Sequence, residues 1–157
     1  MDALRDARAT GASIVFDTNL RPRLWTDAAT MRSWIESCAS HADLILPSFD
    51  DEQQHFGDTD PSATIARYLD CGARQVIVKA GGAPVRFGGT EGDGLVDGLT
   101  RDDPVDTTAA GDSFNAGYLA ARFGGEGIEG AIRAAHDLSR RVIGARGALV
   151  REAVAQA

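Results

Sequence analysis

The segment "VDTTAAGDSFNAGYLAARFGG", residues 105–125, carries the clearest structural signal in this sequence. Small residues run into Asp112 just before an apolar pattern of helical spacing, which predicts a helix from about Ala110. The first amides of a helix have no acceptor within it and lie at the positive end of its dipole. Small side chains let an anion approach these amides, and Gly111 has no Cβ in its path. We therefore expect the amides of Ala109, Ala110 and Gly111 to form an anion pocket.

Asp112 lies beside this expected pocket and has two interpretations. Acids are common in the first turn of a helix because they complement the dipole, so the side chain can be purely structural. In a plain phosphate site, however, a carboxylate repels the ligand. A carboxylate is useful where a hydroxyl group must lose its proton in order to accept a phosphoryl group. Asp112 would then be the general base.

The rest of the chain alternates apolar strands with helices. Buried strands are expected at residues 12–17, 42–47 and 74–81, and an antiparallel hairpin or meander at 83–99. This order predicts an α/β fold with a mostly parallel sheet, whose ligands bind at the carboxyl ends of the strands. The expected helices follow Thr26, Ser48 and Asp60 as caps, and a last helix runs from Ile128 to about Gly144.

Composition narrows the class of protein. The 157 residues carry 16 basic and 23 acidic side chains, a net charge of -7 that argues against a nucleic-acid partner. The length suits one domain, residues 1–157, and the sequence shows no apolar run long enough for a membrane span and no secretory leader. Cys38 and Cys71 have no metal or redox spacing, so we expect reduced, buried thiols and a cytoplasmic protein. Motifs of P-loop kinases, dinucleotide dehydrogenases and serine esterases are absent from the sequence.

The segment "DTTAAGDSFNAGYLA" resembles the C-terminal signature of the PfkB, or ribokinase-like, family of sugar kinases. The resemblance implies a ribokinase-like, Rossmann-like three-layer sandwich. It also implies that Ala109, Ala110 and Gly111 hold the ATP phosphates, and that Asp112 is the catalytic base and contacts the substrate. Asp106 and Thr108 match positions that bind a monovalent cation such as potassium in some members.

Two motifs at the ends of expected strands bear on the substrate and on magnesium. "FDTNLRPRLW", residues 16–25, resembles 2-keto-3-deoxygluconate kinases and some fructokinases, which makes Arg21 the candidate for binding a sugar acid. Arg23 is expected to be a solvated surface residue. In "LPSFDDE" the three acids either start a helix or hold magnesium through waters. The family usually has Asn-x-x-Glu there, whereas this chain has Ser48 and Asp51, so Asp51 is the magnesium candidate.

Two further segments concern the nucleotide. "VIVKAGGAPV", residues 76–85, has the bare pattern of a strand that ends in a tight turn. By resemblance it is the nucleotide-binding loop, lined by Lys79, Gly81, Gly82, Ala83 and Pro84.

His136 lies where the family often has Asn beside the adenine, and it is either a contact to the base or a packing residue.

The resemblance covers only the C-terminal part of the family's fold, so we expect the N-terminal part and the lid over the sugar to be missing. The implied activity is ATP-dependent transfer of the γ-phosphoryl group to a sugar hydroxyl, with ATP and magnesium and with potassium as a further ion. The substrate would be 2-keto-3-deoxygluconate, converted to its 6-phosphate. A fructokinase or other hexose kinase, and a non-catalytic remnant that binds nucleotide, remain alternatives. Expected partners are a sugar or sugar acid, ATP, and a second copy or a complementing N-terminal portion.

Overall fold

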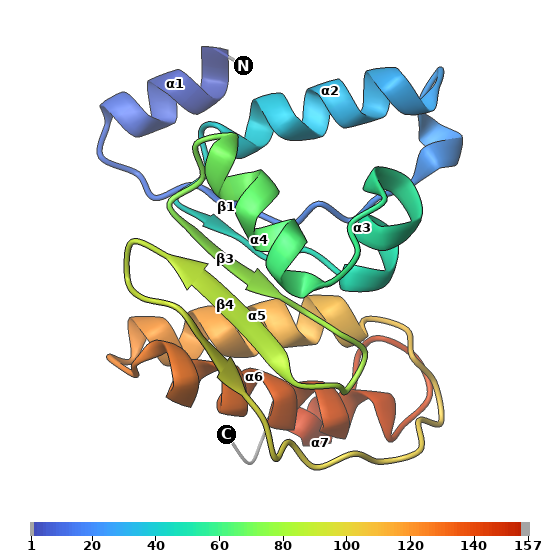
Figure 1. Cartoon of the computed structure of the whole chain (residues 1–157). Coiled ribbons are helices and arrows are strands. Elements are labelled where there is room, and N and C mark those ends of the chain that lie inside the picture. Colours follow the sequence, from blue (N-terminus) through green and yellow to red (C-terminus); the bar gives the residue numbers. More distant parts are fainter. Residues whose placement is uncertain (1, 155–157) are drawn as a thin grey trace. The chain divides into compact units, whose positions relative to one another are not determined.

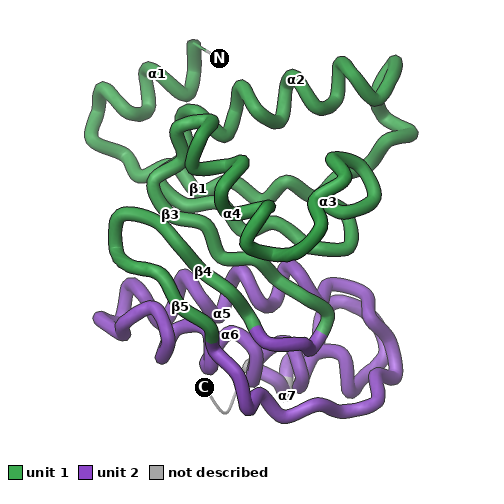
Figure 2. Tube along the Cα trace, in the orientation of Figure 1, with its two compact units in different colours: residues 1–81, 85–95 green, residues 82–84, 96–157 purple. Residues whose placement is uncertain are grey.

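The computed structural model describes residues 2–154 and divides into two compact units (Figure 2). The first unit comprises the residues up to 81 together with 85–95, and the second comprises 82–84 and the residues from 96 onward. Whether the chain folds as one domain stays a prediction.

A mixed sheet organises the first unit (Figure 1). Its strand order is β1-β2-β3-β4-β5, with β1, β2 and β3 parallel and β4 antiparallel to β3. The expected parallel strands and the hairpin that follows them are therefore present. The elements of this unit are α1 (Asp2–Ala9), β1 (Val15–Phe16), η1 (Pro22–Leu24), α2 (Ala28–Ala39), β2 (Leu44–Ile45), α3 (Phe49–Phe56), α4 (Pro61–Asp70), β3 (Gln75–Val78), β4 (Val85–Gly89) and β5 (Gly94–Val96), whose last residue belongs to the second unit.

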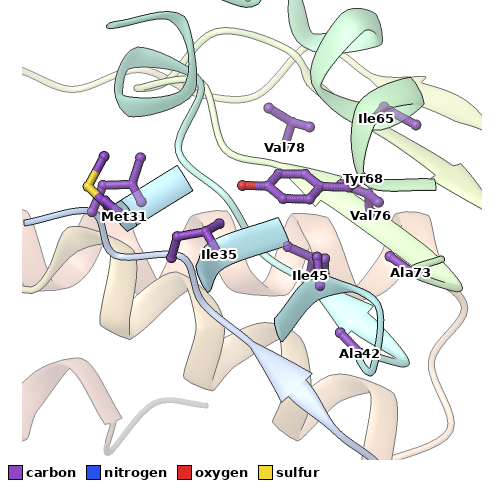
Figure 3. Packing of buried hydrophobic residues seen from close by; sticks show 11 residues of the cluster. Met31, Ile35, Ala42, Ile45, Ile65, Tyr68, Ala73, Val76 and Val78 are labelled. Atoms are coloured by element: carbon purple, nitrogen blue, oxygen red, sulfur yellow. The ribbon is translucent and has the colours of Figure 1, made fainter. Parts of the chain in front are cut away.

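The apolar core of the first unit gathers side chains from α2, α4, β2 and β3 (Figure 3). Helix α4 packs on β3 and β4, and Gly88 makes this close approach possible because a Cβ there would lie 2.8 Å from Cγ2 of Ile65. All four residues of β3 are buried: three are apolar, and the fourth, Gln75, donates from its side-chain amide to the Gly92 carbonyl and accepts from the Glu91 amide. The cluster consists of Leu20, Met31, Ile35, Ala39, Ala42, Ile45, Ile65, Tyr68, Ala73, Val76 and Val78.

Two of the three predicted helix caps, Ser48 and Asp60, occupy the cap position, and the third, Thr26, does not. Asp60 caps α4 through bonds from the amides of Ser62 and Ala63, as expected. Thr26 is not the cap of α2: Asp27 occupies that position, because its carboxylate reaches the Thr30 amide at 2.7 Å.

Ser48 does occupy the cap position of α3, but its side chain makes no capping bond. Cys38 and Cys71 are free, and both are half-buried rather than fully buried.

The second unit is built on two packed helices, α5 (Ala110–Phe123) and α6 (Ile128–Ile143), followed by α7 (Arg151–Val154). Both long helices begin where the sequence predicts. Gly117 lets them approach closely, because a Cβ there would lie 2.9 Å from Cα of Ala135 and 3.3 Å from Cβ of Leu138. Among the described residues, no helix combines the length and apolar character that crossing a membrane requires.

Candidate functional site

The start of α5 has the backbone geometry of an anion site. Ala109 has φ 62°, which lies in the left-handed region that residues other than glycine rarely adopt. The Ala110 amide does not point to a free pocket, because it donates to the carbonyl of Thr107 at 3.1 Å. Within residues 2–154, the amides of Ala109, Gly111 and Asp112 have no acceptor. The unpaired donors therefore differ from those expected at one position, since the amide of Asp112 takes the place of the Ala110 amide.

The Asp112 side chain is exposed next to these donors. It makes no hydrogen bond or ion pair with any other residue that the structure describes. The helix behind it is anchored by Phe114 and Tyr118, which are both buried. A carboxylate held on a fixed helix and free of protein partners can accept a proton from an external hydroxyl group.

Hydroxyl groups tie the carbonyls of this turn in place. The Oγ of Ser113 donates to the carbonyls of Ala109 at 2.7 Å and Ala110 at 3.0 Å. The Oγ of Ser139, on α6, donates to the Ala110 carbonyl at 2.9 Å. The turn is therefore held both from within α5 and from the neighbouring helix.

Asp106 fixes the approach to the same turn. Its Oδ1 accepts from the Thr108 amide at 2.9 Å, and its Oδ2 accepts from the Gly147 amide at 2.9 Å. These bonds lower the pKa of Asp106 to about 2, with the Thr108 side chain as the largest cause and the two amides next. The geometry shows a structural role for this carboxylate, and the monovalent cation at Asp106 and Thr108 stays a prediction.

One face of α6 holds the irregular segment of residues 97–106. The contacts run in chain order along both partners, and the α6 residues are spaced at i, i+3, i+7 and i+10, which places them on one side of a helix. The spacing of the three polar side chains among them, Arg133, His136 and Arg140, is visible in the sequence and would have indicated the contact face. The pairs are Arg133 Nη1 to the Asp97 carbonyl, His136 Nε2 to the Thr100 carbonyl, Arg140 to the Asp102 carboxylate, and the Ile143 carbonyl to the amides of Val105 and Asp106.

His136 takes part in this contact face and is buried. Its Nε2 lies 2.6 Å from the Thr100 carbonyl, and because a carbonyl only accepts, Nε2 must carry the proton. Only Nδ1 is then left for a nucleotide base, so the expected base contact stays a prediction with this one atom available.

In the first unit, the carboxyl ends of β1, β2 and β3 bring three polar residues to one edge of the sheet. Ser48 and Lys79 form a parallel bridge just beyond β2 and β3. The Nζ of Lys79 lies 3.3 Å from Oδ1 of Asp17, which follows β1. Lys79 thus lies where the parallel sheet predicts a ligand, and its ammonium group is paired with an acid there.

The two remaining candidates of this unit lie in the segments that follow β1 and β2. Arg21 is exposed, and its Nη1 donates to the carbonyl of Leu20 at 2.7 Å. Asp51 is half-buried in the first turn of α3 and has no partner within the described part of the chain. No cluster of three or more His, Cys, Asp or Glu side chains is arranged for a metal within residues 2–154, so the magnesium role of Asp51 stays a prediction through waters.

The glycine turn after β3 has the conformation that its sequence predicts. Gly81, which belongs to the first unit, has φ 55°, and Gly82, which belongs to the second unit, has φ 88°. A Cβ at Gly82 would lie 3.4 Å from Nε of Arg101, so this turn runs close to that guanidinium. Ala83 and Pro84 are exposed. Their predicted contacts with ATP, like those of the two glycines, stay predictions.

Sequence reasoning missed Glu52, the third acid of "FDDE". It is fully buried and accepts from Thr18 Oγ1 at 2.9 Å, Arg67 Nη2 at 2.7 Å and Tyr68 Oη at 2.8 Å. Burial raises the pKa of Glu52, and the three hydrogen bonds oppose that rise. The spacing of residues in the sequence did indicate that Glu52 is buried, because Glu52 shares a helical face with Phe49 and Phe56, which pack on the core.

Comparisons with known proteins extend over most of this chain. The sequence profile of the pfkB family carbohydrate kinases matches residues 1–152. The chain is 38% identical over 159 residues to the 2-dehydro-3-deoxygluconokinase of Escherichia coli (strain K12), an alignment that covers 98% of this chain and 51% of that protein. It therefore spans about half the length of the curated relatives that it matches.

Two solved structures have the same architecture. The PfkB protein from Polaromonas sp. JS666 matches with a TM-score of 0.82 and 31% identity, over 99% of this chain and 50% of its own. Aminoimidazole riboside kinase from Salmonella enterica, solved with aminoimidazole riboside and an ATP analogue, matches with a TM-score of 0.81 and 26% identity, over 94% of this chain and 51% of its own. The predicted ribokinase-like α/β fold is confirmed, and its sheet is mixed, with β1, β2 and β3 parallel and β4 antiparallel to β3.

Proposed function

The chain belongs to the pfkB family of carbohydrate kinases, and we propose that it carries the nucleotide-binding and base-bearing portion of an ATP-dependent sugar kinase. The reaction would transfer the γ-phosphoryl group of ATP to a hydroxyl group of a sugar acid, 2-keto-3-deoxygluconate. Because the chain spans about half of its curated relatives, a complementing portion or a second copy would complete the sugar site. We place the protein in the cytoplasm, where ATP is available and its two free thiols stay reduced.

The geometry at the start of α5 is the observation that carries this proposal. Unpaired amides at Ala109, Gly111 and Asp112 lie at the positive end of a 14-residue helix. The left-handed backbone of Ala109 costs about 1–3 kcal/mol of strain, a cost typical of sites where the backbone has a task. Amides arranged in this way suit the terminal phosphate of a nucleotide.

In the proposed reaction, Asp112 orients the acceptor hydroxyl and takes its proton. The unpaired amides stabilise the negative charge that develops on the transferred phosphate. Bound magnesium would neutralise charge on the nucleotide, and Asp51 fits it because a half-buried carboxylate without a described protein partner can bind the ion through water. Asp106 and Thr108 are proposed to contribute to a potassium site beside the same turn.

The choice of a sugar acid rests on Arg21 and on the named relatives. Arg21 is exposed and keeps most of its guanidinium donors available, since one of them bonds to the Leu20 carbonyl. A guanidinium group binds a carboxylate through two oxygens at once. The Escherichia coli relative is named for a sugar acid of this kind. Fructose or another hexose is the alternative substrate.

The proposal is tested by measuring ADP release with 2-keto-3-deoxygluconate, fructose and ribose. We expect turnover with the sugar acid, and we expect Asp112→Asn to lower kcat by about 10²- to 10⁴-fold. Glu129→Gln is the matched control, because Glu129 is an exposed acid in the first turn of α6. It should leave kcat unchanged.

Three outcomes would redirect the proposal. Unchanged turnover in Asp112→Asn would remove the general-base role. Turnover with fructose alone would replace the sugar acid by a hexose. ATP binding without turnover of any sugar would make this chain a nucleotide-binding remnant.

A further inference from the structure

A buried polar network in the first unit reaches the substrate loop that the sequence predicts. Glu52 is fully buried, and its Oε1 accepts from Thr18 Oγ1 at 2.9 Å. Its Oε2 accepts from Arg67 and Tyr68, which belong to α4. The carboxylate therefore connects α4 to the segment that follows β1.

The α4 side of this network is rigid. Arg67 also bonds to both carboxylate oxygens of Asp58, at 3.1 Å and 2.7 Å. Its guanidinium lies over the ring of Phe56, 3.9 Å from the centroid. Because charged hydrogen bonds in a buried setting are strong and directional, Glu52 has little freedom to rotate.

In the segment of residues 17–21, here called the 17–21 loop, buried and exposed residues alternate from residue 18 onward. Thr18 is buried and bonds to Glu52, and Leu20 is buried in the apolar core. Between them Asn19 is exposed, and its φ of 37° places its backbone in the left-handed region. Arg21, the last residue of the loop, is exposed.

We propose that Glu52 is a positioning residue that acts through Thr18 to fix the 17–21 loop and thereby the Arg21 guanidinium that binds the sugar acid. The inference rests on the proposed function, because it assigns a task to Arg21. Glu52 touches neither substrate nor nucleotide in this role. The three acids of "FDDE" therefore differ in their surroundings: Asp50 is exposed, Asp51 is half-buried and Glu52 is buried.

The test removes the Thr18 hydroxyl and compares it with an equivalent hydroxyl elsewhere in the network. Thr18→Val keeps the shape of the side chain and deletes the bond to Glu52. Thr64→Val is the matched control, because Thr64 is also buried and donates to a carboxylate of the same network, Asp58, at 2.8 Å. Thr18→Ser restores a hydroxyl group and should rescue the variant.

Two measurements report the result. The first is hydrogen exchange in a peptide covering residues 19–25, which contains the amides of Leu24 and Trp25 bonded to the carbonyls of Arg21 and Pro22. The second is the KM for the sugar acid beside the KM for ATP. We expect Thr18→Val to speed this exchange and to raise the sugar-acid KM about tenfold or more with the ATP KM unchanged, because a small displacement of a binding group is costly.

Thr64→Val should change neither measurement, although it loses a comparable bond. Equal effects of Thr18→Val and Thr64→Val, or no effect of Thr18→Val, would overturn the proposal. If the parent chain does not phosphorylate any sugar, the proposed function of this chain fails, and the exchange comparison still decides whether Glu52 fixes the loop.

Discussion

Ser139 of α6 donates a hydrogen bond from its Oγ to the carbonyl oxygen of Ala110, the first residue of α5, at 2.9 Å. The bond ties the first turn of one helix to the side of the other. The unpaired amides at the start of α5 keep their direction only if this turn stays in place. A residue 29 positions away in the chain therefore supports the expected phosphate site.

Ser139→Ala should weaken ATP binding several-fold and lower the free energy of unfolding by about 1 kcal/mol, because one partly buried hydrogen bond is lost. Calorimetric titration with ATP and urea denaturation measure the two effects. Ser40→Ala removes a hydroxyl-to-carbonyl bond to Ser37 at the end of α2 and should leave ATP affinity unchanged. Equal ATP affinity of Ser139→Ala and the parent would contradict this role.

The left-handed backbone at Ala109 predicts opposite tolerance for two substitutions. Ala109→Val should destabilise the protein by about 1–3 kcal/mol, because a β-branched side chain is poorly accommodated at φ 62°. Ala109→Gly should change stability by less than about 1 kcal/mol, because relief of strain offsets the greater freedom of the unfolded chain. Urea denaturation measures both. Equal stability of the two variants would show that Ala109 does not hold this conformation in solution.

The pKa of Asp106, lowered to about 2, predicts a stability change in acid. The folded state keeps this carboxylate ionised below the ordinary value of 3.8, so its contribution is present above pH 3.8 and is lost as the pH falls toward 2. Asp106→Asn should therefore show a smaller drop in melting temperature between pH 4 and pH 2. Asp103→Asn is the control, since Asp103 is exposed and makes no hydrogen bond within the described part of the chain. Identical acid profiles of parent and Asp106→Asn would refute the prediction.

Substitution by alanine is expected to change the stability of the protein in different ways at two helical glycines. Gly117→Ala should destabilise the protein by about 1–3 kcal/mol, because the new Cβ meets the Ala135 backbone at 2.9 Å. Gly130→Ala should be neutral or stabilising by about 1 kcal/mol, because only the flexible end of Glu126 must move and alanine favours the helix. Thermal melts of the two variants decide the matter, and a stabilised Gly117→Ala would contradict the tight packing of α5 on α6.

Much of the fold follows from local patterns. The start of α5 at Ala110, the cap of α4 at Asp60 and the end of α6 before Gly144 agree with the structure. Thr26 failed as a cap because the neighbouring Asp27 is a charged and better-placed acceptor, a competition between adjacent residues that the pattern does not resolve. The engagement of the Ala110 amide by Thr107 was also missed, because it depends on the backbone angles of a turn.

Local sequence patterns were enough to predict the alternation of strands and helices, the small-residue turn before Asp112 and membership in a kinase family, because these depend on periodicity, capping and short motifs. The partners of buried or paired side chains became known only from the packed structure: Glu52 accepts from Thr18, 34 residues away, and Arg140 pairs with Asp102, 38 residues away. Those partners meet only after the sheet and the helices have packed. Contacts between distant residues depend on the order of the packed elements, which local sequence patterns do not specify.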